Sequence, residues 1–197
     1  CGSGIWAKAL TEAGYDVLGI DISDAMIDLA RKKAPKANFQ TASLLRVELP
    51  KCDAITSIGE CLNYQFDEHG LGEIQQLFAR IYEALRPGGL FIFDILQPGS
   101  LTVSNPHQIY YEGEEWAILL EKEEDKKTST LTRKMTIFRQ VGELYRKSAE
   151  IHRVRLYKSA EIAKELRQVG FRVRIIRGYG ELTFRKAHVG FIATKIA

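Results

Sequence analysis

The first hundred or so residues alternate between short apolar runs and segments in which apolar side chains recur every three or four positions. The short runs predict buried strands, and the recurring spacing predicts helices with one buried face. Such alternation of strands and helices is typical of an α/β fold with a mostly parallel sheet covered on both faces. We expect helices at 5–13, 24–34 and 71–85, and strands at 16–20, 37–40, 53–58 and 90–95.

Local signals support these boundaries. Gly14 follows the first predicted helix as a C-terminal glycine, and Ser23 stands where an N-cap residue would begin the second. Pro35 ends that second helix because proline cannot continue it. The strand at 90–95 is apolar except for Asp94.

The period changes after residue 99. Apolar and polar residues alternate around Trp116 and again from Leu131 to Ile137. In the second segment Arg133 stands at one of the alternate positions that are otherwise apolar. This period of two predicts antiparallel strands, with a third extended segment at 143–157. We therefore expect an inserted β meander over 107–157, with a polar turn at 123–127.

The C-terminal part returns to helix and strand. Ser159 is expected to cap a helix that ends at Gly170, and two strands, 171–176 and 188–194, close the sheet. With no repeat or low-complexity linker in sight, residues 1–197 are expected to form a single domain that contains the meander.

Composition narrows the class of protein. Of 197 residues, 45% are hydrophobic and 27% are charged, which is a globular balance and excludes disorder, collagen and coiled coil. No apolar run approaches the roughly 18 residues of a membrane span. The three cysteines are sparse and the four histidines scattered, so we expect a cytoplasmic protein without disulfides or a metal site.

The net charge of +3 conceals an asymmetry. Residues 133–197 hold 16 Lys and Arg against 5 Asp and Glu, while residues 1–132 hold 12 against 20. The basic part is compatible with an acidic substrate or a nucleic acid. Because its charges are spaced rather than clustered, ordinary solvent-facing strands and helices explain it equally simply.

A glycine turn carries the first chemical signal. Gly2 and Gly4 open a helix, where glycine permits a sharp turn and helix amides face a ligand. Asp21 follows at the end of the next strand, where a carboxylate can accept both hydroxyls of a ribose. Together they predict a nucleoside-containing cofactor. A strand normally feeds such a turn, and because none precedes Cys1 we expect the first strand of the fold to be absent from this sequence.

Three segments in order resemble the class I S-adenosylmethionine-dependent methyltransferases. They are the glycine-rich start at 1–4, the segment Leu18-Gly19-Ile20-Asp21-Ile22-Ser23-Asp24-Ala25-Met26, and the turn Leu85-Arg86-Pro87-Gly88-Gly89-Leu90. The segment from Gly170 onward resembles the closing antiparallel hairpin of that family. The resemblance implies a Rossmann-like, doubly wound fold, S-adenosylmethionine as cofactor and S-adenosylhomocysteine as product.

The resemblance also implies roles for individual residues. Asp21 would bind the ribose hydroxyls of the cofactor. The residues of the glycine turn would face its methionine part, and the residues that follow Asp21 would flank its adenine. Serine stands at 43, where many family members have an aspartate, and the acidic residue that ends the family's first strand is missing. The implied cofactor residues are Gly2, Ser3, Gly4, Asp21, Ile22, Met26, Ser43, Leu44, Ile58, Gly59 and Glu60.

Methyl transfer from an activated sulfonium needs positioning, exclusion of water and sometimes a base. Glu150 and His152 would share one face of a strand, and the histidine could accept a proton near neutral pH. They precede Arg155 and Tyr157 in a segment that resembles small-molecule N- and O-methyltransferases, although a solvent-facing polar pair would give the same pattern. The residues expected to contact substrate are Tyr64, Tyr110, Tyr111, Trp116, Arg155 and Tyr157.

The sequence therefore predicts methyl transfer to a nitrogen or oxygen of a small molecule by a monomer or homodimer, without nucleic acid or membrane. One alternative is a nucleic-acid methyltransferase that uses the basic C-terminal part. A nicotinamide-dependent oxidoreductase shares the glycine turn, but the turn at 86–89 argues against it. A non-catalytic binding module with an incomplete cofactor site is the remaining alternative.

Overall fold

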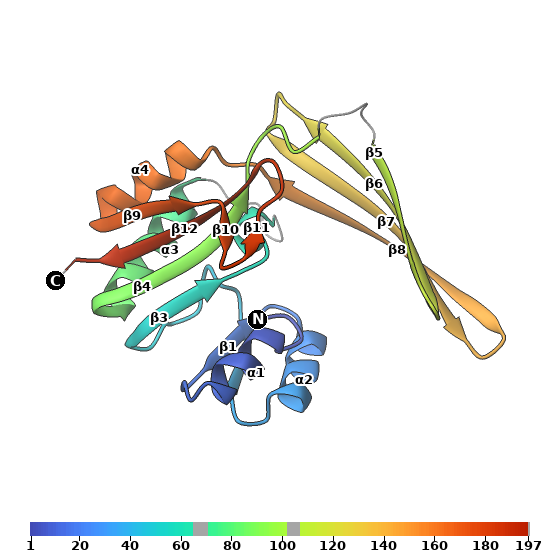
Figure 1. Ribbon diagram of the computed structural model, residues 1–197, viewed down its shortest axis with the longest axis horizontal. Helices are drawn as coiled ribbons and strands as arrows, with labels where there is room; N and C mark the ends of the chain where they lie inside the picture. Colours follow the sequence, from blue (N-terminus) through green and yellow to red (C-terminus); the bar gives the residue numbers. More distant parts are fainter. Residues whose placement is uncertain (65–70, 102–106, 197) are drawn as a thin grey trace. The chain divides into compact units, whose positions relative to one another are not determined.

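The computed structural model describes residues 1–64, 71–101 and 107–196, drawn in Figure 1. The chain divides into two compact units. The smaller unit combines residues 1–51 with 71–84, and the larger unit contains 52–70 and 85–197. We predicted a single domain because the sequence contains no linker. No linker marks the boundary between the two units, because the chain passes between them several times and the smaller unit is made of two chain segments.

The smaller unit contains helices α1 (Ile5–Glu12), α2 (Asp24–Lys33) and α3 (Leu71–Ala84) and strands β1 (Leu18–Asp21) and β2 (Asn38–Thr41). The two strands pair in parallel, and α2 packs against both of them with Ile27 and Ala30 fully buried. Two parallel strands that are connected by a helix form the βαβ unit that the sequence pattern predicts.

Capping signals in this unit act as predicted. The Ser23 hydroxyl accepts a hydrogen bond from the Met26 amide at 3.3 Å and so caps α2. Gly14 follows α1 with a φ of 91°, a left-handed conformation that glycine adopts without strain. Of the apolar residues predicted to line one face of this helix, Ile74, Phe78 and Ile81 are buried in α3, which confirms the three- and four-residue spacing as the signature of a helix.

The larger unit is built on a sheet with strand order β3–β4–β12–β9. Strands β3 and β4 are parallel, whereas β12 is antiparallel to both of its neighbours, so three of the four strands share one direction. Stacked rings of Phe91, Phe93 and Phe191 fill the centre of this sheet, with centroids 4.4 and 4.8 Å apart. The strands are β3 (Cys52–Ser57), β4 (Leu85–Leu96), β9 (Phe171–Ile176) and β12 (His188–Lys195).

The predicted turn at 86–89 lies inside β4 rather than before it. Cys52 pairs with Leu85, but Ala54 already pairs with Leu90, so β4 contains an irregularity of several residues at this point. Gly88 has a φ of 80°, and a Cβ on Gly89 would lie 2.8 Å from the Arg86 carbonyl oxygen. Glycines are needed here because the chain folds tightly upon itself before it continues as a strand.

The predicted meander is a separate antiparallel sheet of four strands in the order β5–β6–β7–β8. Figure 1 shows these strands as a long, twisted ribbon. The sequence predicted three extended segments and missed β5. The strands are β5 (His107–Gly113), β6 (Trp116–Asp125), β7 (Thr130–Val141) and β8 (Leu144–Arg155).

Two local predictions were wrong. The turn expected at 123–127 lies at 126–129, because Glu124 points to the buried side and remains in strand β6. Ser159 is the first residue of helix α4 (Ser159–Val169) rather than its cap, since Lys158 occupies the N-cap position. The Ser159 amide instead donates to the side-chain oxygen of Gln97 at 3.0 Å.

The remaining elements of the larger unit are short. The 3-10 helix η1 (Cys61–Asn63) follows β3, helix α4 packs against β9, and β10 (Gly178–Tyr179) pairs with β11 (Leu182–Thr183). Helix α4 ends at Gly170 with a φ of 113°, as predicted. Within the described ranges, no helix is long and apolar enough to cross a membrane.

Candidate active site

Asp21 organises the glycine turn in the smaller unit. One carboxylate oxygen accepts the Gly2 amide at 2.7 Å, and the other accepts the Ser23 amide at 3.0 Å. Burial raises the pKa of Asp21, but the hydrogen bonds from the Ser23 and Gly2 amides lower it, and the net shift is downward. The Cys1 backbone nitrogen also donates to this carboxylate at 3.1 Å, so one of its roughly four acceptor positions remains for a ligand. Asp21 is therefore a fixed anion whose side chain is 19% exposed.

The two glycines of the turn have different roles. Both have positive φ, but a Cβ on Gly2 would meet no atom within 4 Å, whereas a Cβ on Gly4 would lie 2.8 Å from the Ala30 Cα. Gly4 is therefore required for close packing of α1 on α2. Gly2 leaves open space above the backbone, which is the kind of position at which a ligand can approach the main chain.

The other predicted cofactor residues of this unit surround or support that turn. Ile22 and Met26 are 47% and 42% exposed, an unusual position for two apolar side chains beside a fixed carboxylate. The Ser3 hydroxyl accepts a hydrogen bond from the Lys33 ammonium at 3.3 Å. The Ser43 hydroxyl accepts the Leu45 amide at 3.3 Å and so folds its own loop rather than projecting from it.

Arg80 of α3 fixes the same loop, and the sequence analysis missed it. Its guanidinium donates to the carbonyl oxygens of Leu44, Leu45 and Val47 at 3.2, 2.5 and 3.1 Å. Three carbonyls held by one cation give a loop without regular secondary structure a defined shape. An arginine on the otherwise apolar side of a helix was the signal available in the sequence.

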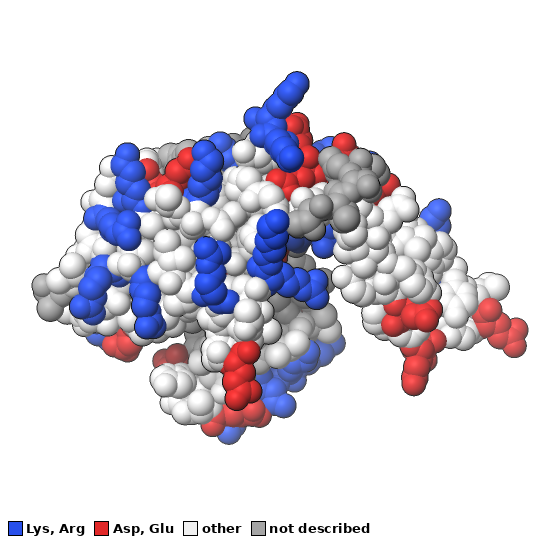
Figure 2. Space-filling model, turned by 45° about the horizontal axis from the view of Figure 1, so that its top comes forward, with Lys and Arg blue, Asp and Glu red and all other residues white. Residues whose placement is uncertain are grey.

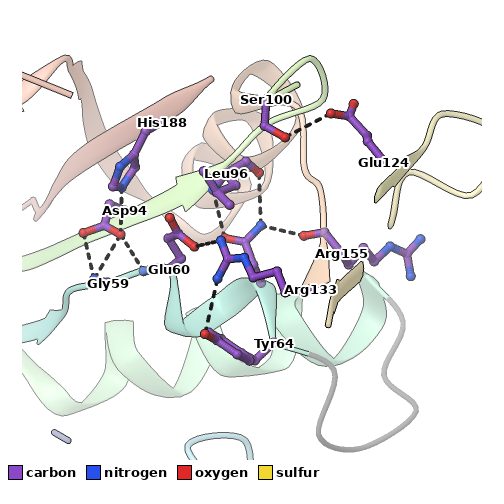
Figure 3. Close-up of polar contacts among 11 residues, drawn as sticks. Gly59, Glu60, Tyr64, Asp94, Leu96, Ser100, Glu124, Arg133, Arg155 and His188 are labelled. Atoms are coloured by element: carbon purple, nitrogen blue, oxygen red, sulfur yellow. Dashed lines mark hydrogen bonds and ion pairs between the residues drawn. The ribbon is translucent and has the colours of Figure 1, made fainter. Parts of the chain in front are cut away.

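In the larger unit, a buried carboxylate holds the turn after β3. Asp94 is 1% exposed and accepts the Gly59 amide at 3.1 Å and the Glu60 amide at 2.6 Å (Figure 3). Gly59 and Glu60 both have positive φ, at 92° and 63°. A left-handed glutamate costs about 1–2 kcal/mol, which the hydrogen bonds to Asp94 offset.

Two further side chains approach Asp94. The Tyr179 hydroxyl donates at 3.0 Å, and His188 Nε2 lies 3.1 Å from the carboxylate. Burial raises the pKa of Asp94, but His188, the amides of Gly59 and Glu60, and Tyr179 outweigh it and lower the pKa overall. Burial and the neighbouring Asp94 raise the pKa of Tyr179. Asp94 is thus an ionised buried carboxylate. The sequence analysis assigned it no role, although its isolation within an apolar strand was a signal available in the sequence.

The turn held by Asp94 places Glu60 in a polar cluster with the antiparallel sheet. Arg133 of β7 pairs with the Glu60 carboxylate at 2.5 Å and donates to the Tyr64 hydroxyl at 3.3 Å (Figure 3). The side chains of Glu60 and Arg133 are only 18% and 16% exposed. The rings of Tyr64 and His152 meet edge to face, with centroids 5.6 Å apart. We call Glu60, Tyr64, Arg133 and His152 the Glu60 cluster.

The predicted pair of Glu150 and His152 does share one face of its strand. The His152 Nε2 atom lies 3.1 Å from the Glu150 carboxylate, with the side chains 29% and 51% exposed. The histidine is the more enclosed member of the pair because its ring packs against Tyr64. Glu150 faces solvent and contacts the imidazole from that side, so it can orient the ring.

Asn63 fixes η1 between the two sheets of the larger unit. It is completely buried, donates to the carbonyl oxygens of Leu96 and Arg155 at 3.0 and 2.5 Å, and accepts the Leu96 amide at 2.9 Å. An apolar cluster surrounds this junction, consisting of Leu96, Leu131, Val154 and Leu156 with Tyr64 and Leu101 against it. The Glu60 cluster therefore has a rigid support.

The predicted substrate-binding aromatics do not form one wall. Tyr110 and Tyr111 are consecutive in β5 and so face opposite sides of the sheet. Tyr110 bonds Glu112 and, with Trp116, Phe138 and Tyr145, lines an open hollow of about 450 Å³. Tyr157 is 5% exposed, with the Arg155 guanidinium 5.8 Å from its ring, so it belongs to the core. Of the six residues predicted to contact substrate, Tyr64 is a member of the Glu60 cluster.

The predicted cofactor residues of the larger unit are Ile58, Gly59 and Glu60. Ile58 is 40% exposed, and its carbonyl oxygen lies 3.4 Å from the Cys61 thiol sulfur. The turn that they form ends β3 and leads directly into the Glu60 cluster. The sequence placed these residues near the reacting group through the family resemblance alone.

Comparison with known proteins agrees with this geometry. Residues 1–89 match the family model described as a methyltransferase domain. A protein of Geobacillus sp. (strain WCH70), provisionally named a methyltransferase, is 27% identical over 187 residues, which cover 88% of this chain and 72% of the relative.

Solved structures show the same fold. An S-adenosylmethionine-dependent methyltransferase from Clostridium acetobutylicum superposes with a TM-score of 0.86 at 22% identity, covering 100% of this chain and 82% of the other. CalS10 of Micromonospora echinaspora, an amino pentose methyltransferase solved with S-adenosylmethionine, superposes with a TM-score of 0.79 at 16% identity, covering 99% and 80%. These findings confirm the resemblance to class I S-adenosylmethionine-dependent methyltransferases that the sequence shows, and the solved structures confirm the Rossmann-like fold.

Proposed function

We propose that this enzyme methylates a nitrogen or oxygen atom of a small molecule, with the Glu60 cluster on the acceptor side of the reaction. The observation that carries the proposal is the assembly of Glu60, Tyr64 and His152 around Arg133. Three residues predicted separately for the cofactor, substrate and catalytic roles thus come together in one unit. The amino pentose specificity named for CalS10 supports a small acceptor with a polar nucleophile.

The residues of the smaller unit fit the cofactor. Asp21 offers an ionised carboxylate to the ribose hydroxyls, and the exposed side chains of Ile22 and Met26 offer an apolar surface for the adenine. Gly2 leaves room for a ligand against the backbone. S-adenosylmethionine, when bound, supplies an electrophilic methyl group on a sulfonium that needs no further activation.

The remaining work of the protein is to position the acceptor and remove a proton. We assign His152 as the base, because its second ring nitrogen is available when Nε2 contacts Glu150. Tyr64 packs edge to face against this imidazole and restricts its orientation. Arg133 holds Tyr64 and Glu60 in place, so that the acceptor meets an ordered polar surface.

A nucleic-acid substrate remains the alternative. On the face shown in Figure 2, Lys and Arg side chains are spaced among other residues and do not form one continuous patch. Spaced charges favour a small acceptor, because backbone recognition of nucleic acid uses a contiguous basic footprint.

A methyl-transfer screen tests the proposal. The enzyme would be incubated with radiolabelled S-adenosylmethionine and pools of small amines and alcohols, and separately with mixed RNA and DNA. We expect transfer to a small molecule and a fall of about 10²–10⁴-fold for His152→Asn, the usual contribution of a general base. Glu123→Gln, an exposed change elsewhere on β6, is the matched control and should retain activity. Transfer to nucleic acid alone, or full activity of His152→Asn, would contradict the proposal.

A further inference from the structure

Four basic side chains lie in one line across the antiparallel sheet. His107 of β5 is directly opposite Lys122 of β6, Lys122 is opposite Arg133 of β7, and Arg133 is opposite His152 of β8. Directly opposed residues of antiparallel strands project from the same face, with Cβ atoms about 4.5–5.5 Å apart. We call these four residues the basic row.

The basic row destabilises the sheet. Like charges directly opposite one another are destabilising, and here an ammonium and a guanidinium are neighbours. Glu60 neutralises Arg133, but within the described ranges the side-chain ammonium of Lys122 makes no hydrogen bond or ion pair. A sheet that retains this arrangement has an unbalanced cation on a partly enclosed face.

The surroundings of Lys122 strengthen this imbalance. Burial lowers the pKa of Lys122, the nearby charges of Arg133 and Arg185 lower it further, and Glu60 opposes them. Arg185 comes from the segment before β12, so cations from two parts of the larger unit converge on Lys122. An anion placed among these groups would relieve their mutual repulsion and raise the pKa of Lys122.

The same face becomes apolar beyond the basic row. The next residues on that face, two positions further along each strand, are Ile109, Leu120 and Met135, all partly exposed, and Glu150 of β8. A ligand that places a charged group at the basic row would therefore lay an uncharged body against Leu120 and Met135. The face offers anionic and apolar recognition side by side.

We propose that the methyl acceptor carries a carboxylate or phosphate group, and that Lys122 binds this group with Arg133 beside it. The proposal rests on the proposed function, because it identifies the acceptor side of the enzyme with the Glu60 cluster, of which Arg133 is a member. It narrows the substrate class from small amines and alcohols to those that carry an acid. The reacting nitrogen or oxygen then lies at His152, next to Arg133 on the same row.

Binding of simple anions tests the proposal without knowledge of the substrate. Inorganic phosphate, acetate and octanoate would be titrated into the enzyme by calorimetry, with chloride as the reference. We expect phosphate or the carboxylates to bind more tightly than chloride, and octanoate more tightly than acetate because of the apolar residues beside the row. Tighter binding of phosphate would assign a phosphorylated acceptor, and tighter binding of octanoate an acceptor carboxylate.

Matched variants locate the site. Lys122→Gln should weaken anion binding by about tenfold or more, the loss expected for one charge-assisted hydrogen bond, and Lys122→Arg should restore it. Lys134→Gln is the control, since Lys134 is adjacent to Arg133 on β7 but faces the opposite side, where it pairs with Glu121 at 2.8 Å. Equal weakening by Lys134→Gln, or no binding beyond that of chloride, would overturn the proposal.

A parallel titration with S-adenosylhomocysteine separates this inference from the proposed function. Lys122→Gln should bind S-adenosylhomocysteine as the unchanged protein does, which also shows that the variant is folded. If S-adenosylhomocysteine binds and the anions do not, the basic row has no such role and the methyltransferase remains. If the anions bind at Lys122 and S-adenosylhomocysteine does not, the anion site stands and the proposed function fails.

Discussion

Asp94→Asn is the substitution whose effect follows most directly from the structure. The change keeps the size of a side chain that is 1% exposed but removes its charge and replaces one acceptor oxygen by a donor. The amides of Gly59 and Glu60 and the Tyr179 hydroxyl all donate to this carboxylate. At least one of these donors would then face another donor in a buried environment.

The magnitude can be worked from these contacts. A hydrogen bond to a charged group contributes about 1.5–3 kcal/mol, and at least one would be lost and the others weakened. Relief from burying a charge offsets part of the loss. We therefore expect Asp94→Asn to lower the free energy of unfolding by about 3 kcal/mol at neutral pH. Asp53→Asn is the matched control, because Asp53 is 82% exposed and pairs only with the surface residue Arg86, so its loss should be under about 1 kcal/mol.

The difference should also depend on pH in a defined direction. The pKa of Asp94 is lower in the folded protein than in the unfolded chain, where it is about 4. Its contribution is therefore fully present above pH 4 and is lost as the pH falls through the lower, folded value. Urea unfolding at pH 7 and at successively lower pH would measure both proteins. Equal stability of Asp94→Asn at pH 7, or a difference that does not shrink in acid, would refute this account of the turn.

Three further substitutions test packing and polar contacts by urea unfolding or proteolysis. Gly4→Ala should cost about 2 kcal/mol or more, because it combines a left-handed backbone with a close contact, whereas Gly14→Ala meets open space and should cost about 1 kcal/mol; equal costs would contradict the packing argument. Asn63→Ala removes three hydrogen bonds to the backbone of Leu96 and Arg155, of which the Leu96 carbonyl keeps a partner in the Tyr157 amide, and should cost about 3 kcal/mol; a cost below 1 kcal/mol would show that water replaces the side chain. Arg80→Ala should make the loop at 43–47 the first site of limited proteolysis, and an unchanged digestion pattern would count against its role.

Local signals in the sequence predicted much of the fold. Helix spacing in 71–85, the Ser23 cap and the glycine after α4 each depend on residues a few positions apart, and the structure confirms them. The meander was predicted from its period of two, but β5 was missed and the turn after β6 was misplaced. Glu124 determines where that turn begins, because its carboxylate accepts a hydrogen bond at 2.7 Å from the amide of Gly99. These residues are 25 positions apart, so no local pattern reveals the contact.

The candidate site was less predictable for the same reason. Glu60 and Arg133 are 73 positions apart, and only the strand register places them together. The sequence identified His152 and Glu150 by parity, but not the opposed cations on the neighbouring strands. Register requires knowledge of which strands pair and at which residues, so the basic row becomes visible only in the structure.

Calorimetric titration with S-adenosylhomocysteine tests the central claim most directly, because the cofactor defines the enzyme class and Asp21 its expected anchor. We predict binding that weakens at least about tenfold in Asp21→Asn, which keeps the shape of the side chain but loses the charge that holds the ribose hydroxyls. Asp28→Asn, an exposed change on α2 beside Arg31, should bind as the unchanged protein does. Failure of the unchanged protein to bind, or equal binding by Asp21→Asn, would contradict the assignment of the cofactor site.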